Sequence, residues 1–229
     1  MNRLVEQKDE LVPIKQALQL DGADVLDLGC DIGSLARRIT KETGAASVTA
    51  MDVDAAQIAR AKAKGGAVNY LTGGAEALPL KDASLDAVVM MKSLHHVPIP
   101  QMDAAFSELS RVLRPGGCVY ICEPAYEGPF NEILRIFHDE GVVRAAALEA
   151  LKRALVGQFE LAQESDYLRI VRYQDLEEFR SKMMNLPWLE NRITPEIEAQ
   201  VAAAWPNHAA ADGSAALSSR MLVFVLRKR

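Results

Sequence analysis

A carboxylate stands in the middle of a turn that has the features of a ligand-binding turn. The segment Val25–Ile39 reads as an apolar strand, a turn from Gly29 to Gly33, and the first turns of a helix. Such a helix start offers unpaired N–H groups and a partial positive charge to a ligand. Asp31 occupies a place where such turns commonly carry glycine, and Asp52 follows 23 residues after Gly29. The chemistry of this turn therefore depends on which ligand accepts nearby carboxylates.

Two classes of ligand compete for the turn. A dinucleotide needs the pattern G-x-G-x-x-G, but Asp31 and Ser34 replace its second and third glycines. A carboxylate facing a pyrophosphate would also cost on the order of 1 kcal/mol or more. S-adenosylmethionine instead carries a sulfonium, an ammonium and one carboxylate, so an acid near the turn is neutral or favourable toward it. Asp27 is placed to accept from the ammonium, and Asp52 to bond both ribose hydroxyls. The local alternatives are a turn hydrogen bond for Asp27 and a solvated or helix-capping role for Asp52.

The first half of the chain alternates strand and helix patterns, which predicts right-handed βαβ units and a parallel sheet. In such a sheet, ligands bind beyond the carboxyl ends of the strands, where the strand order reverses. Helices are expected to start at Ser34 as N-cap, to follow the cap Asp54, and to cover Met102–Leu113. The predicted strands are Ala23–Leu28, Ser47–Val53, Ala67–Leu71, Ala87–Met91 and Cys118–Cys122.

The second half is expected to be mainly helical, with two strands. No linker separates the halves, so we predict one domain over residues 1–229. Residues 1–124 would be the cofactor-binding half, and residues 125–229 would supply substrate-pocket or lid helices and closing strands. Plain packing on the core is the alternative for these helices, and Trp188 and Trp205 are expected in the core or a lid.

The last strand's partner is either Tyr167–Tyr173 or a shorter piece near Ser214. The predicted elements are helices over Phe130–Phe137, Val143–Leu155 and Leu176–Met183, a helix from Thr194 with Pro195 first, and the strands Tyr167–Tyr173 and Arg220–Leu226.

Composition narrows the class of protein. The chain has 229 residues, 49% of them hydrophobic, and a net charge of −5, so it lacks the broad basic field of a nucleic-acid binder. It has no apolar run of about 18 residues and a charged start, which argue against membrane spanning and a signal peptide. Three cysteines indicate a reducing compartment, and a cytoplasmic protein is expected. No metal site is expected. Cys118 and Cys122 lie on one strand, and residues 138–140 are adjacent on a predicted helix, so their side chains do not share one face of it.

Six segments occur in order over about residues 20–124. They are V-L-D-L-G-C-D-I-G from Val25, T-A-M-D to Asp52, G-G-A-E-A-L-P-L to Leu80, S-L-D-A-V-V-M-M to Met91, L-H-H-V to Val97 and L-R-P-G-G to Gly117. Together they resemble the class I S-adenosylmethionine-dependent methyltransferases of the methyltransferase type 11-like group, which act mainly on small molecules. The resemblance implies an α/β fold with a doubly wound, mostly parallel, seven-stranded Rossmann-like sheet and helical elaboration in the C-terminal half. It also implies S-adenosylmethionine as cofactor and a small-molecule acceptor.

The resemblance implies roles for the matching residues. Asp27, Gly29 and Gly33 would frame the methionine moiety, Asp52 the ribose, and Met91 the methionine end. Two positions depart from the pattern: Asp31 replaces the middle glycine, and Gly74 replaces an acid that usually reaches the adenine amino group. The loss at Gly74 is worth about 0.5–1.5 kcal/mol, whereas Asp tolerates the positive φ that such a turn imposes. The implied cofactor-binding residues are Asp27, Gly29, Asp31, Gly33, Asp52, Val53, Ala75, Glu76 and Met91, with Ala75 and Glu76 following the adenine edge.

Methyl transfer from a sulfonium is an in-line displacement, so the protein must align the acceptor and, for many acceptors, remove a proton. Candidate bases follow the fourth and fifth strands. They are Glu123, His95 and Tyr126, with His96 beside His95; alternatively, one histidine packs and fixes the loop. The other functions in contention are ligand binding without transfer on the same fold, a protein or RNA methyltransferase, and a nicotinamide enzyme. The acceptor, the methylated atom and the oligomeric state are not set by the sequence.

Overall fold

The structure is a computed structural model that describes residues 4–186, 189 and 192–229. The chain forms two compact units. The larger unit comprises Asp9–Glu123, Val143–Ser165 and Leu222–Arg229, and the smaller unit comprises the residues up to Lys8, Pro124–Val142 and Asp166–Met221. The two units do not coincide with the predicted halves 1–124 and 125–229, because Val143–Ser165 and Leu222–Arg229 belong to the larger unit. That residues 1–229 act as one domain stays a prediction.

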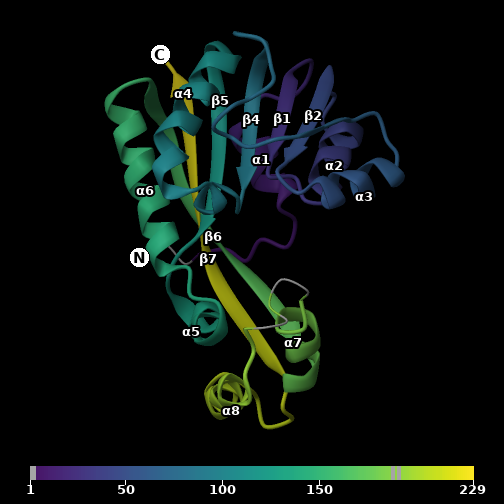
Figure 1. Ribbon diagram of the computed structural model, residues 1–229, viewed down its shortest axis with the longest axis vertical. Helices are drawn as coiled ribbons and strands as arrows, with labels where there is room; N and C mark the ends of the chain where they lie inside the picture. The colour runs from purple at the N-terminus through teal and green to yellow at the C-terminus, as the bar shows by residue number, and fades with distance from the viewer. Residues whose placement is uncertain (1–3, 187–188, 190–191) are drawn as a thin grey trace. The chain divides into compact units, whose positions relative to one another are not determined.

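Within the described residues, seven strands form one sheet in the order β3-β2-β1-β4-β5-β7-β6 (Figure 1). The pairs β3–β2, β2–β1, β1–β4 and β4–β5 are parallel. The order reverses between β1 and β4, which is the switch point where α/β sheets bind ligands. The predicted doubly wound α/β sheet is thus confirmed. The strands are β1 Asp24–Leu28, β2 Ser47–Asp52, β3 Asn69–Thr72, β4 Leu85–Met91, β5 Leu113–Pro124, β6 Phe159–Tyr173 and β7 Ala215–Lys228.

The helices largely follow the predicted pattern. The Asp54 side chain accepts from the N–H groups of Ala56 and Gln57, and so caps α3 as predicted. Thr194 likewise caps α8. The helices are α1 Leu11–Ala17, α2 Ser34–Glu42, α3 Ala55–Ala63, α4 Met102–Val112, α5 Gly128–Phe137, α6 Gly141–Val156, α7 Leu176–Met183 and α8 Pro195–Ala204, with 3₁₀ turns η1 Leu94–His96, η2 Ile99–Gln101 and η4 Trp205–Asn207.

The structure differs from the predicted elements in several details, among them the start of β7 at Ala215 rather than Arg220. The N-cap of α2 is Gly33, in the left-handed conformation, rather than Ser34. Helix α1 was not predicted at all. Strand β5 starts at Leu113 rather than Cys118, because Leu113 pairs with Leu85 before the register shifts and Ala87 pairs with Cys118. The intervening residues belong to an irregular stretch of strand instead of a loop.

The question of the last strand's partner is settled by the strand order. β7 lies between β5 and β6, so its outer partner is β6, which contains the predicted segment Tyr167–Tyr173 and extends it back to Phe159. The residues near Ser214 contribute an isolated bridge between Ala209 and Ala215.

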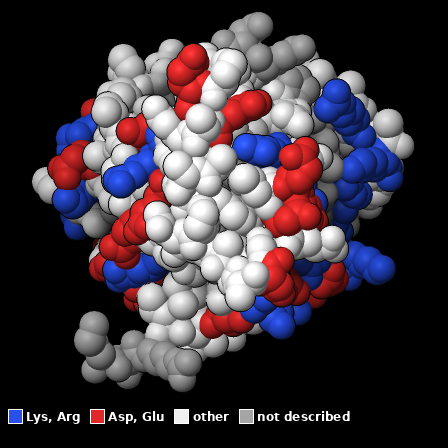
Figure 2. All heavy atoms as spheres, turned by 90° about the horizontal axis from the view of Figure 1, so that it is seen from below, with Lys and Arg blue, Asp and Glu red and all other residues white. Residues whose placement is uncertain are grey.

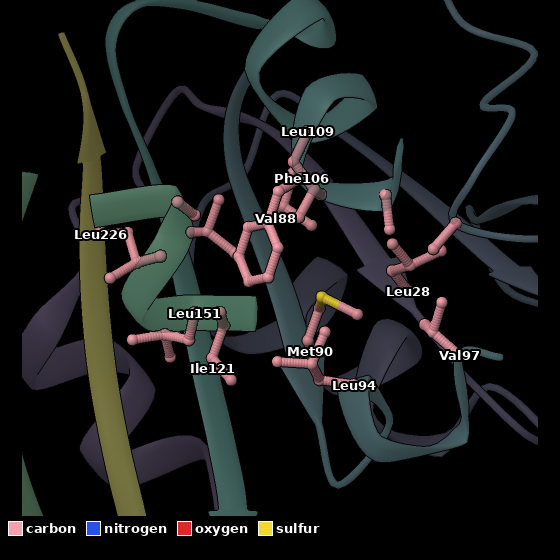
Figure 3. Packing of buried hydrophobic residues seen from close by; sticks show 14 of the residues in the cluster. Leu28, Val88, Met90, Leu94, Val97, Phe106, Leu109, Ile121, Leu151 and Leu226 are labelled. Atoms are coloured by element: carbon pink, nitrogen blue, oxygen red, sulfur yellow. The ribbon is translucent and has the colours of Figure 1, made fainter. Parts of the chain in front are cut away.

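The core of the larger unit fills the space between the sheet and helices α4 and α6. Figure 3 shows Val88 and Met90 of β4 and Ile121 of β5 beside Phe106 of α4 and Leu151 of α6. Burying each such side chain contributes about 1.5–3 kcal/mol. Side chains alternate between the faces of a strand, so the sheet has a second face to cover. Helix α2 lies against β1, where Asp27 accepts from an N–H of α2.

The smaller unit has its own core. The aromatic side chains of Phe137, Tyr173, Phe179 and Trp205 are buried and contact one another edge-on or tilted, at centroid distances of 5.1–6.3 Å. Trp205 therefore packs in a core, as one of the two predicted possibilities, whereas Trp188 lies outside the described residues. That this unit forms an acceptor pocket or lid stays a prediction.

The surface carries charges of both signs. On the face drawn in Figure 2, acidic and basic side chains are interspersed around a region of uncharged residues. Of the helices in the described part of the chain, none has the length and apolar character required to cross a bilayer.

Candidate cofactor-binding site

A cavity of about 510 Å³ opens at the carboxyl ends of β1, β2, β3 and β4, within the larger unit. It lies at the switch point of the sheet, beyond the ends of β1 and β4, where α/β sheets bind ligands. Of the nine predicted cofactor-binding residues, Gly33 is not among the lining residues. The other eight line the cavity: Asp27, Gly29, Asp31, Asp52, Val53, Ala75, Glu76 and Met91.

The turn between β1 and α2 is wound through three left-handed residues. Gly29, Asp31 and Gly33 have φ angles of +83°, +50° and +69°. Glycine is unstrained in this region, and Asp is among the side chains that enter it most readily. A methyl group at Gly33 would lie 2.6 Å from the ring of Tyr70, so close packing also requires glycine there. The turn therefore places Asp31 in the cavity at a modest backbone cost.

Gly29 is the point where the turns after β1 and β4 meet. A Cβ built on Gly29 would lie 2.4 Å from the Cβ of Ser93. The Ser93 hydroxyl donates to the carbonyl of Leu28 at 2.7 Å, which holds the two turns together. The predicted framing role of Gly29 thus has a steric basis.

We expect Gly29→Ala to lower the free energy of unfolding by about 3 kcal/mol, because it combines left-handed strain with overpacking against Ser93. The measurement is urea denaturation. Gly22→Ala is the matched control. Gly22 has a φ of +71°, but a methyl group added there would meet no atom within 4 Å, so only strain of about 1 kcal/mol remains. Equal losses in the two variants would contradict a steric role for Gly29.

Asp52 is anchored by the backbone on both carboxylate oxygens. Oδ2 accepts from the N–H of Asp31 at 2.8 Å, and Oδ1 accepts from the N–H of Asp54 at 2.9 Å. Each carboxylate oxygen has a second lone-pair site. Asp52 is therefore fixed in orientation and still able to accept two hydrogen bonds from a vicinal diol such as a ribose.

Asp27 presents a buried, unpartnered oxygen to the cavity. Its side chain is 1% exposed, and its Oδ2 has no hydrogen-bond partner among the described residues. Burial, helped by the charge of nearby Asp52, raises the pKa of Asp27 to about 7 against the lowering effect of the Ala36 N–H. A buried acceptor without a donor is costly. A cationic donor entering the cavity would satisfy it, and the ammonium of S-adenosylmethionine is such a group.

Glu76 takes up the space that the missing acid at Gly74 would need. A Cβ at Gly74 would lie 2.2 Å from Oε2 and 2.4 Å from Oε1 of Glu76. The Glu76 carboxylate thus folds back over residue 74, and it lines the cavity. The departure at Gly74 therefore removes one carboxylate and leaves another beside the same point.

The cavity is strongly acidic. Among its described lining residues, the one lysine or arginine is Lys92, whose Nζ lies 2.6 Å from Oε1 of Glu10. The lining acids are Glu10, Asp27, Asp31, Asp52 and Glu76. Such a lining disfavours a polyphosphate and favours a cation.

The sequence did not single out Glu10, Lys92 or Ser93. Lys92 has a φ of +58°, and its N–H donates to the carbonyl of Cys122 at 2.7 Å. This conformation directs the chain back toward β1 after β4, and no residue pattern indicates it. The only available signal was position, since Lys92 and Ser93 follow directly after a predicted strand.

Glu123 and His95 are buried against each other. One Glu123 oxygen contacts His95 Nδ1, and the other accepts from the N–H of Leu94 at 2.9 Å. Neither Glu123 nor His95 lines the cavity, whereas the exposed His96 does, and its ring centroid lies 4.1 Å from that of His95. The turn thus presents His96 to the cavity and holds His95 behind it. The catalytic roles expected of His95 and Glu123 stay predictions.

Tyr126, the third predicted catalytic residue, belongs to the smaller unit. Its hydroxyl donates to Oδ1 of Asp139 at 2.8 Å, and this hydrogen bond raises the pKa of Tyr126. The same carboxylate oxygen accepts from the N–H of Gly141 at the start of α6. A role for Tyr126 in catalysis stays a prediction.

Comparison with known proteins shows the family of the chain. Residues 25–117 match the family model described as a methyltransferase domain. A ubiquinone/menaquinone biosynthesis C-methyltransferase UbiE from Caulobacter sp. (strain K31) is 31% identical over 191 residues, which cover 76% of this chain and 70% of that protein. Sterol 24-C-methyltransferase ERG6B from Gibberella zeae is 34% identical over 108 residues, 44% of this chain. That match spans 28% of the sterol enzyme, so the chain matches less than a third of its length.

The fold has relatives among solved structures. A candidate methyltransferase from Bacillus halodurans C-125 superposes with a TM-score of 0.68, covering 95% of this chain and 98% of that one, at 18% identity. At this identity the likeness concerns the fold alone. The family follows from the matched methyltransferase domain and from the extended similarity to UbiE. The chain belongs to the class I S-adenosylmethionine-dependent methyltransferases.

Proposed function

We propose that this chain transfers the methyl group of S-adenosylmethionine to a small-molecule acceptor. The observation that carries the proposal is the unpartnered, buried oxygen of Asp27 in a cavity that also holds the anchored carboxylate of Asp52. The two relatives described above are named for methylation of a sterol and for methylation in quinone biosynthesis, and both names support a small-molecule acceptor.

Several lining residues then have distinct tasks toward the cofactor. Asp27 binds the ammonium, Asp52 accepts from the ribose hydroxyls, and Glu76 accepts from the adenine amino group in place of an acid at residue 74. Met91 lies at the methionine end, beside the turn that Gly29 allows. Bound in this way, the cofactor supplies an electrophilic methyl group. The remaining assigned residues, Val53, Ala75 and Gly33, shape the cavity or its turn.

We further propose that His96 holds the acceptor's proton, where the acceptor has one to lose, because His96 is the histidine that lines the cavity. Glu123 and His95 act through it as positioning residues. Together they fix the 3₁₀ turn by two contacts to the Glu123 carboxylate. Tyr126 stays a predicted contributor from the smaller unit.

Glu123→Gln tests the positioning role. An amide has one oxygen, so it can keep only one of the two acceptor contacts, to Leu94 or to His95. We expect the free energy of unfolding to fall by about 1–3 kcal/mol, and turnover to fall more than cofactor affinity. Denaturation, calorimetric titration and steady-state rates measure these effects.

The control is Glu127→Gln, a neighbouring acid whose side chain is 58% exposed and pairs with Arg220. An exposed ion pair of this kind contributes little to stability, so the free energy of unfolding should change by less than about 1 kcal/mol. If Glu123→Gln kept both wild-type stability and wild-type turnover, the positioning role would be excluded.

The proposed function is tested first by binding. Calorimetric titration with S-adenosylmethionine and S-adenosylhomocysteine should give saturable heat, and a pyridine dinucleotide should give none. Absence of binding at about millimolar S-adenosylhomocysteine would remove the enzyme function. Binding without transfer to any sterol-like, quinone-precursor or small phenolic acceptor would favour the alternative of a ligand-binding protein on this fold.

A further inference from the structure

Two lining carboxylates, Glu10 and Asp31, have no task among the assigned cofactor contacts, and Glu10 is paired with Lys92. Asp31 lines the cavity, and this residue is exposed. The backbone holds it there, since the N–H of Asp31 donates to Oδ2 of Asp52 at 2.8 Å. That the cavity receives a cationic ligand rests independently on the buried, unpartnered oxygen of Asp27.

We propose that Asp31 is a specificity-determining residue that favours the sulfonium form of the cofactor over its thioether product. This inference rests on the proposed function and deepens it. It assigns to Asp31 a preference for S-adenosylmethionine over S-adenosylhomocysteine, and therefore a part in releasing the product after transfer.

The charge balance of the reaction supplies the reason. The sulfur–methyl bond breaks and its electron pair stays on sulfur, while the methyl carbon bonds the acceptor's nucleophilic atom and any acceptor proton leaves to a base. The cofactor thereby passes from a net charge of +1, with sulfonium, ammonium and carboxylate, to a net charge of zero. The ammonium and carboxylate are the same before and after. A carboxylate near the sulfur therefore distinguishes the substrate form from the product.

Asp31 is the acid best placed for this effect. The sulfur is bonded to the 5′ carbon of the ribose, and the backbone N–H of Asp31 donates to Asp52, which is assigned to that ribose. Glu76 follows β3, which lies two strands away from β1 in the sheet. Two strand spacings correspond to about 10 Å along the sheet edge. The charge of Glu10 is balanced by Lys92 at 2.6 Å.

The backbone conformation of Asp31 also indicates that its carboxylate has a function. With a φ of +50°, this position would suit glycine without strain, as at Gly29 and Gly33 on either side. A non-glycine side chain kept in the left-handed region beside a site, even at a modest backbone cost, points to a task for that side chain.

Calorimetric titration of Asp31→Asn with both ligands tests the proposal. Asn tolerates the left-handed region, keeps the backbone N–H and removes only the charge. We expect the Kd of S-adenosylmethionine to rise about fivefold and that of S-adenosylhomocysteine to change less than about twofold. In the wild type, raising the salt concentration should reduce the same preference, since salt screens an exposed charge.

Glu76→Gln is the matched control, because it removes another lining carboxylate at the adenine side and should affect both ligands equally. Equal weakening of both ligands by Asp31→Asn, or no change in either, would overturn the inference while leaving the proposed function in place. Failure of the wild type to bind either ligand would remove the proposed function itself. Asp31→Gly, which relieves the strain and also removes the charge, should reproduce the selective loss and guards against a folding defect in the Asn variant.

Discussion

Asp52→Ala should weaken the binding of S-adenosylmethionine at least about a hundredfold. The variant removes a carboxylate that is fixed by the N–H groups of Asp31 and Asp54 and lines the cavity. Two hydrogen bonds from ribose hydroxyls to a charged acceptor are lost, each worth about 1.5–3 kcal/mol. The Asp31 N–H loses its acceptor as well, so the turn after β1 is less ordered. Isothermal titration calorimetry measures the effect.

Asp54→Ala separates this loss from damage to the neighbouring helix. Asp54 follows Asp52 by two residues but caps α3 rather than lining the cavity. Losing such a cap costs about 1 kcal/mol of stability, and cofactor affinity should remain within about twofold. Wild-type affinity in Asp52→Ala would mean that the ribose binds elsewhere.

Asp27→Asn should make the protein more stable at high pH while weakening cofactor binding at least about tenfold. Burial raises the folded-state pKa of Asp27 from 3.8 to about 7. The protonated form is thus favoured by folding: its contribution to stability is complete below about pH 3.8 and is lost as pH rises through about 7. These two pKa values correspond to about 4 kcal/mol. Asn does not titrate, so the variant does not lose this stability as the pH rises. Its neutral amide, however, cannot neutralise the charge of an ammonium group.

The measurement is urea denaturation of both proteins at about pH 5 and about pH 8. The stability of Asp27→Asn relative to wild type should rise by about 3 kcal/mol between these pH values. Asp24→Asn, on the same strand, is the control. Hydrogen bonds from Ser47 and Arg114 lower the pKa of Asp24, so its contribution is lost only as pH falls below the ordinary range of an Asp. A pH-independent difference for Asp27→Asn would show that Asp27 is hydrated rather than desolvated.

Much of the cofactor site was predictable because it depends on strand ends. The apolar segments of β1, β2 and β4 are evident in the sequence, and parallel topology brings the residues after them to one edge. Asp27 and Asp52 could therefore be placed at this edge from position alone, and both line the cavity. The same logic does not extend to side chains that reach back along the chain, such as Glu76 over Gly74.

The catalytic assignments depended on orientation, which the sequence does not contain. His95 and His96 are neighbours on a tight turn, and a shift of one residue decides which ring enters the cavity. Glu123 ends β5, where alternate residues face opposite sides of the sheet, and its two acceptor contacts turn its carboxylate toward the turn after β4. Helix α1 was missed because it is only seven residues long, with a proline among them, and so offers too little periodicity.

The residues lining the cofactor cavity all fall between Glu10 and Pro98. The smaller unit, by contrast, is assembled almost entirely from later parts of the chain. Gene recombination that exchanged the later parts would thus leave the cavity's own residues unaltered. Such an exchange would still replace Val143–Ser165 and Leu222–Arg229, which belong to the larger unit, so the two units do not correspond to two separable blocks of sequence.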